Sequence, residues 1–305
     1  MAKLRRNHTK GGGGTGGILP KAGIFAVLLG LLYFAFSNVE GLSGLFDTDS
    51  NTAVDYDHQP DPELYYLPTS TTGEVVYHDF YTLSYSEPHE QAEWVAYELT
   101  RSRLNQQWVE RSNDFRTDPK VRDGSAQWDD YLHTGYDRGH LVPAADMAFN
   151  QTAMSETFYM SNISPQDPKF NGGIWRELEE LTRDWAKRFG KLYVVSGPVL
   201  GPNDKKTIGK SNRVTVPASY YKVLLDLSPD DPKAIGFLLP NRSSDEPVHE
   251  YAVPVDAIEA MTGIDFFGEL LEPGLEAELE RNFRLGEWET NERRYNLRVK
   301  KWNNR

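Results

Sequence analysis

The chain has 305 residues, of which 39% are hydrophobic, and its formal net charge is −12. This length is enough for one large domain or two small ones, and we expect one domain with an N-terminal appendage. The sequence contains no cysteine, which excludes disulfide scaffolds, thiolate zinc sites and cysteine nucleophiles and leaves any metal to His, Asp, Glu or Asn. The acidic balance argues against a protein that coats nucleic acid through its overall field, but it allows a local basic groove.

The N-terminal residues predict a membrane anchor. Residues 1–21 hold five basic side chains, no acidic one and a Gly-rich run, which is typical of a flexible segment. The 18 uncharged residues of 22–39 would rise about 27 Å as a helix, close to the hydrocarbon thickness of a bilayer. We therefore expect a transmembrane helix there. The alternatives are a buried core helix and a signal peptide cleaved near Ala35 and Ser37.

The charges on either side of the apolar run predict its orientation. Residues 40–62 carry six acidic side chains and neither Lys nor Arg, so we expect a solvated linker. Because basic residues favour the cytoplasmic side, the N-terminus should be cytoplasmic and the rest of the chain should lie across the membrane. A bacterial envelope is the first choice of compartment, and the mitochondrial intermembrane space is the alternative.

From residue 63 the composition becomes globular. Aromatic and β-branched residues predict strands, and the strands are expected within 74–86, 93–99, 190–200, 219–227 and 234–240. The clearest helix is predicted over 172–190, where apolar residues keep to one stripe and Gly190 supplies the stop. Residues 251–267 predict a short strand and a helix that Asp256 could cap. This mixture indicates an α+β domain over 63–290, followed by a basic tail over 291–305.

One short stretch concentrates chemistry. The sequence GYDRGHLVPAADM places Asp137, Arg138 and His140 within four residues, among small apolar ones. A neutral His is the usual general base near pH 7, so His140 could take a proton from water. About thirty residues later a polar loop leads through Asn171 into the predicted helix. Because Mg²⁺ prefers oxygen ligands and keeps most of its waters, the amide oxygen of Asn171 can be a sufficient anchor for it.

The spacing of Glu179 indicates an indirect contact with such an ion. It follows Asn171 by eight residues, about 12 Å along a helix axis, which is too far for both to bind one ion directly with ease. Contact through a metal-bound water fits this spacing better, since helical side chains lean toward the N-terminus. On the plainer interpretation, Asp137 and Arg138 form a surface turn, His140 is a partly buried polar residue and Asn171 caps a helix.

The combination of DRGH with the later stretch SNISPQDPKFNGGIWRELE resembles the DNA/RNA non-specific endonuclease family, which includes endonuclease G and the Serratia nuclease. The resemblance continues more weakly through VPASYYKVLLDL, GFLLPN and AVPVDAIEAMTGIDFF. It implies the ββα-metal (His-Me finger) fold, with a central mixed or antiparallel sheet flanked by helices.

The resemblance also implies roles for individual residues. His140 would be the general base, Asn171 the direct magnesium ligand and Glu179 the residue that orients a metal-bound water. The cofactor would be Mg²⁺, with Mn²⁺ or another divalent cation as alternatives. Asn162 would help to shape the site.

Two arginines remain to be assigned. Arg138 belongs to the signature and would either contact phosphate or brace Asp137. Family members also use an upstream arginine against the scissile phosphate, and Arg116 in DFRTDP is the nearest candidate. A groove for nucleic acid could draw on Lys205, Lys206, Lys210 and Arg213, or on the basic run of 291–305, for which a solvated tail is the alternative.

The predicted function is a membrane-anchored, metal-dependent endonuclease that cuts DNA, RNA or both without sequence specificity. Its partners would be the nucleic acid and the membrane, with a homodimer left open. A hydrolase of small phosphodiesters or nucleotides and a catalytically silent binding module of the same fold are the alternatives. No G-x-S-x-G or H-E-x-x-H motif supports a serine hydrolase or a zinc protease.

Overall fold

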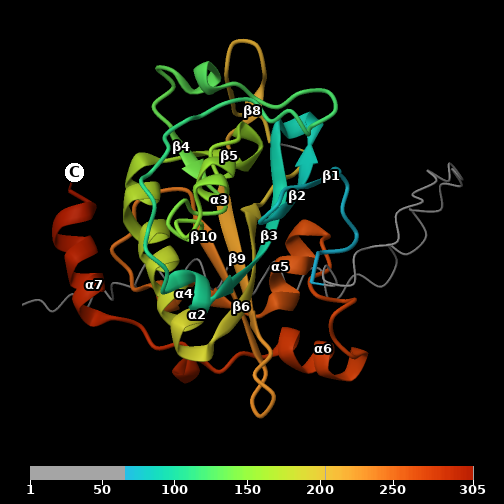
Figure 1. The fold of residues 1–305 in the computed structure, drawn as a ribbon, viewed down its shortest axis with the longest axis vertical. Coiled ribbons are helices and arrows are strands. Elements are labelled where there is room, and N and C mark those ends of the chain that lie inside the picture. The colour runs from blue at the N-terminus through green and yellow to red at the C-terminus, as the bar shows by residue number, and fades with distance from the viewer. Residues whose placement is uncertain (1–65, 203, 305) are drawn as a thin grey trace, which may run out of the picture. The chain divides into compact units, whose positions relative to one another are not determined.

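A computed structural model describes residues 66–202 and 204–304 of the chain (Figure 1). The predicted basic segment, transmembrane helix and acidic linker, residues 1–21, 22–39 and 40–62, lie outside these residues. Within the described part, none of the helices combines the length and the apolar character needed to cross a bilayer.

A seven-stranded antiparallel sheet forms the centre of the domain. Its strands pair in the order β1-β2-β3-β6-β9-β10-β11. Their bounds are Glu74–Tyr77 (β1), Thr82–Ser86 (β2), Gln91–Thr100 (β3), Lys191–Pro198 (β6), Ser219–Asp226 (β9), Lys233–Pro240 (β10) and Ala252–Val253 (β11). The predicted strands are confirmed, and the stretch 74–86 divides into a hairpin because His78 and Tyr81 close a turn, with the His78 N–H donating to the Tyr81 carbonyl at 2.9 Å.

Helices cover both faces of this sheet (Figure 1). They are α4 (Arg176–Phe189) on one face and α5 (Val255–Thr262) with α6 (Pro273–Arg281) on the other. Trp185 of α4 stacks on Phe237 of β10, with ring centroids 5.8 Å apart, whereas Ile258 of α5 lies against the neighbouring Gly236. Since successive residues of a strand point to opposite faces, these two contacts place α4 and α5 on opposite sides.

One predicted helix end agrees with the structure and the other does not. Gly190 ends α4 with φ of +105°, a value that glycine adopts without strain, as predicted. The expected cap of α5 by Asp256 is wrong. Pro254 occupies the N-cap position and Asp256 lies inside the first turn, where its carboxylate interacts favourably with the positive end of the helix dipole.

A smaller unit sits at the edge of the α4 face. Strand β4 (Asp137–His140) pairs antiparallel with β5 (Ile163–Gln166), and the chain then enters a π-helical segment, Phe170–Trp175, that leads directly into α4. Two strands followed by a helix constitute a ββα unit that carries the DRGH motif. The remaining elements are short, and their bounds are Arg101–Leu104 (α2), Gln151–Glu156 (α3), Glu292–Leu297 (α7), Thr207–Ile208 (β7) and Val214–Thr215 (β8).

The C-terminal residues pack against α4 rather than extending into solvent. After α7 comes a π-helical turn, Arg298–Trp302, whose first and last side chains are buried. The guanidinium of Arg298 forms an ion pair with Glu177, and Arg294 forms ion pairs with Glu180 and Asp184 at 2.9 and 2.7 Å. Arg294 and Arg298 are therefore neutralised by carboxylates of α4 and belong to neither a solvated tail nor a groove, whereas Arg293, Lys300 and Lys301 are exposed.

Candidate active site

His140 ends strand β4 with its side chain almost fully buried. Its imidazole packs edge-on against Phe158, with ring centroids 4.9 Å apart, and lies 5.6 Å from the ring of Phe115. Only 8% of the residue is exposed, and Nε2 has no hydrogen-bonding partner within the protein. A buried polar atom without a partner is costly, so Nε2 indicates a place where a ligand or water completes the site.

The protonation of His140 follows from this environment. Burial first and then the positive charges of Arg111 and Arg138, against a hydrogen bond to the backbone of Arg138, lower the pKa of His140 to about 3. The free protein therefore holds a neutral imidazole across the neutral pH range. This is the form that can accept a proton at Nε2.

Glycine at position 139 allows the two strands of the ββα unit to approach closely. A Cβ atom there would come within 2.2 Å of the side chain of Gln166 on β5. The strand pair is further tied to the sheet by Ser164, which donates to Gln91 of β3 at 2.5 Å and hydrogen-bonds Tyr220 of β9. The DRGH motif is thus held on a rigid strand at a fixed distance from the sheet.

Asn171 lies beside the first residue of the motif. Its Nδ2 donates to Oδ2 of Asp137 at 2.9 Å, and its backbone N–H donates to the carbonyl of Asp167 at 2.8 Å. These bonds fix both the side-chain amide and the backbone of the π-helical segment. They use the amide nitrogen, which leaves the amide oxygen, the atom that a hard cation prefers, free of this pairing.

Glu179 belongs to a charged cluster between α4 and the sheet. Burial raises the pKa of Glu179 to about 7, against the opposing charges of Arg183 and Lys222. Arg183 donates to Asp146 at 2.7 Å, and the hydroxyl of Tyr97 donates to the other carboxylate oxygen of Asp146 at 2.7 Å. The cluster therefore balances two carboxylates against two cations in a largely water-excluded place, where charges interact strongly.

Lys222 is the unusual member of that cluster. It lies in the middle of β9, is fully buried, and its Nζ has no hydrogen-bonding partner. The ammonium sits 4.9 Å from the ring centre of Trp175, whose indole N–H points to the His140 carbonyl at 3.4 Å. Burial lowers the pKa of Lys222 to about 8, against Glu179 and Asp146. Lys222 of β9 thus places a positive charge between the sheet and α4, close to Glu179.

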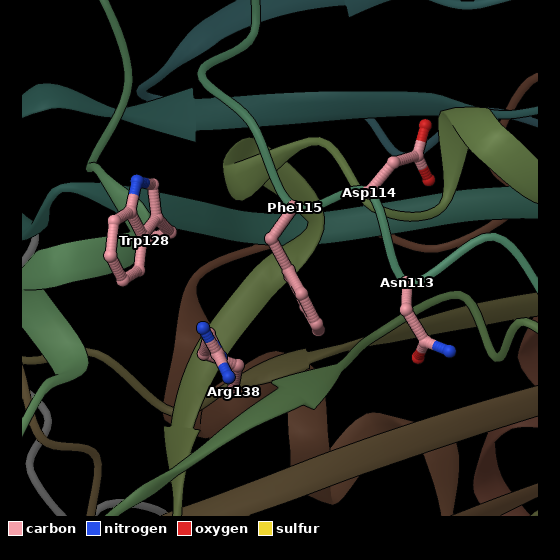
Figure 2. A pocket seen from close by; sticks show the side chains of 5 residues that line it. All are labelled: Asn113, Asp114, Phe115, Trp128 and Arg138. Atoms are coloured by element: carbon pink, nitrogen blue, oxygen red, sulfur yellow. The ribbon is translucent and has the colours of Figure 1, made fainter.

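Arg138 faces an open pocket next to His140. Its guanidinium lies 4.4 Å from the ring centre of Phe115. The pocket has a volume of about 340 Å³ and is lined by Asn113, Asp114, Phe115, Trp128 and Arg138. Figure 2 shows Trp128, Phe115 and Arg138 around one space, while the carboxylate of Asp114 points away from it. The signature arginine is thus positioned toward a solvent-accessible hollow.

The other two predicted site residues have different surroundings. Asn162 is completely buried: its Oδ1 accepts from the Val142 N–H at 2.8 Å, and its Nδ2 donates to the carbonyls of Val142 and Thr157. It therefore holds the backbone two residues beyond His140 without reaching the surface. Arg116 donates to Asp114 and to the Ser155 carbonyl, and it lies 4.0 Å from the ring centre of Tyr159, so its guanidinium is engaged away from His140.

Arg111 is a neighbour of the site that the sequence analysis does not single out. Its positive charge lowers the pKa of His140. Burial lowers the pKa of Arg111 itself, and the negative charge of Glu179 opposes this. It donates to Oδ1 of Asn113 at 2.9 Å, and Asn113 adopts φ of +51°, a conformation that Asn tolerates better than most residues. The sequence indicates a turn at Asn113, because Asn favours tight turns, but nothing in it marks Arg111 as a neighbour of His140.

The donor set near His140 fits a single hard cation. The amide oxygen of Asn171 would be a direct ligand, the carboxylate of Glu179 would act through a metal-bound water, and Nε2 of His140 is an unpartnered base, so the site lacks the close carboxylate group of a high-affinity site. Within residues 66–202 and 204–304, close groups of three acidic side chains occur between α5 and α6, on the other face of the sheet, and are formed by Asp256, Glu259, Asp265, Glu276 and Glu280.

Comparison with known proteins identifies relatives of the domain. A protein of Danio rerio named "Nuclease EXOG, mitochondrial" is 38% identical over 206 residues, which are 62% of this chain and 60% of that protein. "Endonuclease G, mitochondrial" of Homo sapiens is 34% identical over 204 residues, 63% of this chain and 68% of that protein. The match thus spans about three fifths of the length of the EXOG proteins it resembles, 60% and 57% in two of them.

The fold has a solved counterpart as well. The crystal structure of an EndoG/EndoGI complex matches with a TM-score of 0.62 and 32% sequence identity, over 68% of this chain and 90% of that one. The model of the family described as DNA/RNA non-specific endonuclease matches residues 62–272, a range that contains the ββα unit, the central sheet and α5. The chain therefore belongs to the DNA/RNA non-specific endonuclease family.

Proposed function

We propose that this protein is a metal-dependent endonuclease that hydrolyses phosphodiester bonds of DNA, RNA or both with little sequence preference. The observation that carries this proposal is the neutral, buried His140 with an unpartnered Nε2, set between two arginines and beside the Asp137–Asn171 pair. A neutral base and fixed positive charges are the groups that phosphodiester hydrolysis needs.

Each of these residues has a distinct part in the reaction. His140 accepts a proton from the attacking water at Nε2, while its hydrogen bond to the backbone of Arg138 keeps the ring in one orientation. Arg138 and Arg111 bind the phosphate, and Asn162 holds the backbone that follows the motif. Because these groups contact phosphate rather than base edges, the enzyme would cut many sequences.

The proposal assigns the cation to Asn171 as its direct ligand and to Glu179 through a metal-bound water, and it names Mg²⁺ as the cation, with Mn²⁺ or another divalent ion as alternatives. When bound, the cation stabilises negative charge on the phosphate and on the departing oxygen. Asp137 keeps the amide of Asn171 turned so that its oxygen is presented, and the charges of Arg183 and Lys222 favour the ionised form of Glu179 against its burial.

The main alternative is a hydrolase of small phosphodiesters or nucleotides. A deep, closed pocket would favour it, whereas the pocket beside His140 is open and one of its walls, Trp128, is 48% exposed. An open hollow admits a continuous polymer, so the geometry favours the nuclease. A catalytically silent binding module is disfavoured by the presence of a base, an amide ligand and a carboxylate together.

The placement in the cell is also a proposal. We propose that residues 22–39 anchor the chain, with the N-terminus in the cytoplasm and the nuclease domain across the membrane, in a bacterial envelope. The word "mitochondrial" in the names of the EXOG and endonuclease G relatives favours the intermembrane space as the alternative. Protease added to intact spheroplasts or mitoplasts should release an active fragment that begins within residues 40–65. Cleavage only after the inner membrane is opened would mean that the chain has the opposite orientation.

The direct test of activity uses the full chain. Incubated with supercoiled plasmid and with structured RNA in the presence of magnesium, it should nick and degrade at least one of them, and EDTA should abolish the reaction. Degradation of neither polymer, with turnover of small nucleotide phosphodiesters, would establish the alternative in place of the nuclease.

A further inference from the structure

The pocket beside His140 has an aromatic character that phosphate binding does not require. Trp128 forms one wall, and the ring of Phe115 forms another next to the guanidinium of Arg138 (Figure 2). The same Phe115 ring also contacts the imidazole of His140, with centroids 5.6 Å apart. The hollow is therefore one aromatic ring away from the proposed base.

Trp128 is exposed but firmly positioned. It begins a 3-10 turn, Trp128–Tyr131, in which Asp130 and Tyr131 are buried. The carboxylate of Asp130 accepts from the Gln127 N–H at 3.0 Å and thereby closes the turn. A large aromatic side chain that stays 48% exposed on a fixed turn leaves apolar surface in water that a ligand could cover.

The same turn is hydrogen-bonded to the basic loop between β7 and β8. Oδ1 of Asp130 accepts from the backbone N–H groups of Lys210, Ser211 and Asn212, at 3.1, 3.2 and 3.3 Å. This docks the loop between β7 and β8 next to Trp128, and that loop includes the exposed Lys210 and Arg213. Lys206, just before β7, lies over the ring of Tyr136 directly before the DRGH motif. Positive charge for a nucleic-acid backbone thus flanks the aromatic wall.

The one acidic residue of the lining does not oppose such a ligand. Asp114 accepts from Arg116 at 2.8 Å and from the Ser155 hydroxyl at 2.6 Å, and its carboxylate points away from the space between Trp128 and Arg138 (Figure 2). The side of the pocket that Trp128, Phe115 and Arg138 form is therefore aromatic and positively charged. A planar, apolar-faced group attached to a phosphate matches this combination.

We propose that Trp128 and Phe115 form a stacking subsite for one unpaired nucleobase of the strand that is cut at His140. The inference rests on the proposed nuclease function and adds to it a preference for single-stranded or locally opened segments. Bases of an intact duplex are stacked on one another, so only an unpaired or extruded base can cover Trp128. Stacking is tolerant of base identity, which agrees with cutting that lacks sequence specificity.

The test compares two ligands of equal charge on the full chain in EDTA, where cleavage is blocked. One is a fluorescently labelled ten-residue oligothymidylate, and the other is a ten-residue oligomer of abasic sites with the same phosphates. The wild type should bind the oligothymidylate roughly tenfold more tightly, the difference expected from stacking of one base. Trp128→Ala should abolish this difference and leave the affinity for the abasic oligomer unchanged, and Trp128→Phe should restore most of it.

Trp108→Ala is the matched control, since Trp108 is 54% exposed and does not line the pocket. It should keep the tenfold preference for bases. Equal affinities of the wild type for the two ligands, or equal losses in Trp108→Ala and Trp128→Ala, overturn the subsite while plasmid cleavage with magnesium keeps the nuclease. A wild type that neither binds these ligands nor cleaves plasmid or RNA overturns the nuclease and the subsite together.

Discussion

At the scale of single residues, the environment of His140 explains how a histidine can be held ready as a base in an acidic protein. Two aromatic rings exclude water from it, and two arginines oppose its protonation. A phosphate bound by those arginines would offset their charge, so the imidazole would become more basic when substrate is present. The base would thus be neutral when free and more ready to accept a proton when substrate is bound.

His140→Ala should lower cleavage by roughly 10²- to 10⁴-fold, the range for loss of a general base, while nucleic-acid binding is retained. Turnover is measured on plasmid at saturating magnesium, and binding is measured in EDTA. Asn162→Ala serves as the contrast, because it removes a fully buried amide with three hydrogen bonds and should therefore lower stability as well as activity. Wild-type turnover in His140→Ala would remove this residue from the mechanism.

Asn171→Ala should sharply raise the magnesium concentration needed for half-maximal cleavage, because it removes the only direct protein ligand proposed for the ion. Asp137→Ala should raise it roughly 10- to 100-fold, since Asp137 orients the amide of Asn171 and does not itself bind the ion. Glu179→Gln should lower turnover while some metal binding is kept. Identical magnesium titrations of the wild type and Asn171→Ala would contradict the assignment.

The residue scale also shows where reading the sequence reaches its limit. The DRGH signature and the polar loop predicted His140, Arg138, Asn171 and Glu179, which the fold places on β4 and along the adjoining π-helical segment and α4. The sequence indicated only Arg116 as the upstream arginine and offered no basis for choosing Arg111, five positions earlier in the same loop. That choice depends on the positive φ of Asn113, which turns the chain between them, and on the engagement of Arg116 with Asp114.

At the scale of elements, helix α4 was predicted from the sequence because it buries one regular face, and strands such as β9 because they are short, nearly continuous apolar runs that are buried along their length. A lysine inside the apolar stretch SYYKVLLDL was the available sign that β9 contributes more than packing, since lysine is rarely buried without a partner. What the sequence could not supply is the partner, because Glu179 lies on a helix forty-three positions earlier in the chain.

Lys222→Met should shift the acidic limb of the pH–rate profile to higher pH. Burial raises the pKa of Glu179 to about 7 and Lys222 opposes this, so loss of the ammonium should raise the pKa of Glu179 further and protonate it at neutral pH. Activity would then be recovered only at higher pH. Lys233→Met is the matched control. Lys233 is a buried lysine of β10 whose Nζ lies 3.1 Å from the carboxylate of Asp226, and its loss should lower stability without moving the acidic limb.

Helices α5 and α6 carry a second pH effect. Burial and the charges of Glu259 and Glu276 raise the pKa of Glu280 to about 8, above its ordinary value of 4.5. A carboxyl whose pKa is raised by folding contributes stability below pH 4.5 that is lost as the pH rises to about 8. Glu280→Gln should therefore raise the Tm by roughly 2–4 °C at pH 8.5 in EDTA, about 1 kcal/mol for a domain of this size, and leave it unchanged near pH 4.

The control for this measurement is Glu278→Gln, an exposed position on the same helix, which should change the Tm at neither pH. Equal Tm values for the wild type and Glu280→Gln at pH 8.5 would mean that the negative charge at Glu280 is already compensated in the folded protein. A drop in Tm would mean that the carboxylate contributes to stability there.

At the scale of the whole molecule, the chain's last residues complete the unit that holds the candidate site. A Cβ at Gly173 would meet the side-chain oxygen of Asn303 at 2.8 Å, so the C-terminal segment touches the π-helical turn two residues from Asn171. The sequence showed only six basic residues from Arg293 to Arg305. The packing of Arg294 and Arg298 could not be predicted because their carboxylate partners lie on α4, more than a hundred positions earlier.

Arg298→Ala should therefore destabilise the domain and impair the site together. Arg298 is completely buried, pairs with the buried Glu177 and donates to the carbonyl of Glu246 at 2.7 Å, so its removal leaves a carboxylate in the interior without a partner. Such a loss costs about 3–5 kcal/mol, which urea unfolding would register as a lower midpoint at an unchanged m-value. Arg293→Ala, at an exposed position of the same segment, should have no effect. Replacing both members by Met should recover much of the stability, since an apolar pair leaves no buried charge. If Arg298→Ala unfolds at the wild-type midpoint, the C-terminal segment does not support α4 in solution.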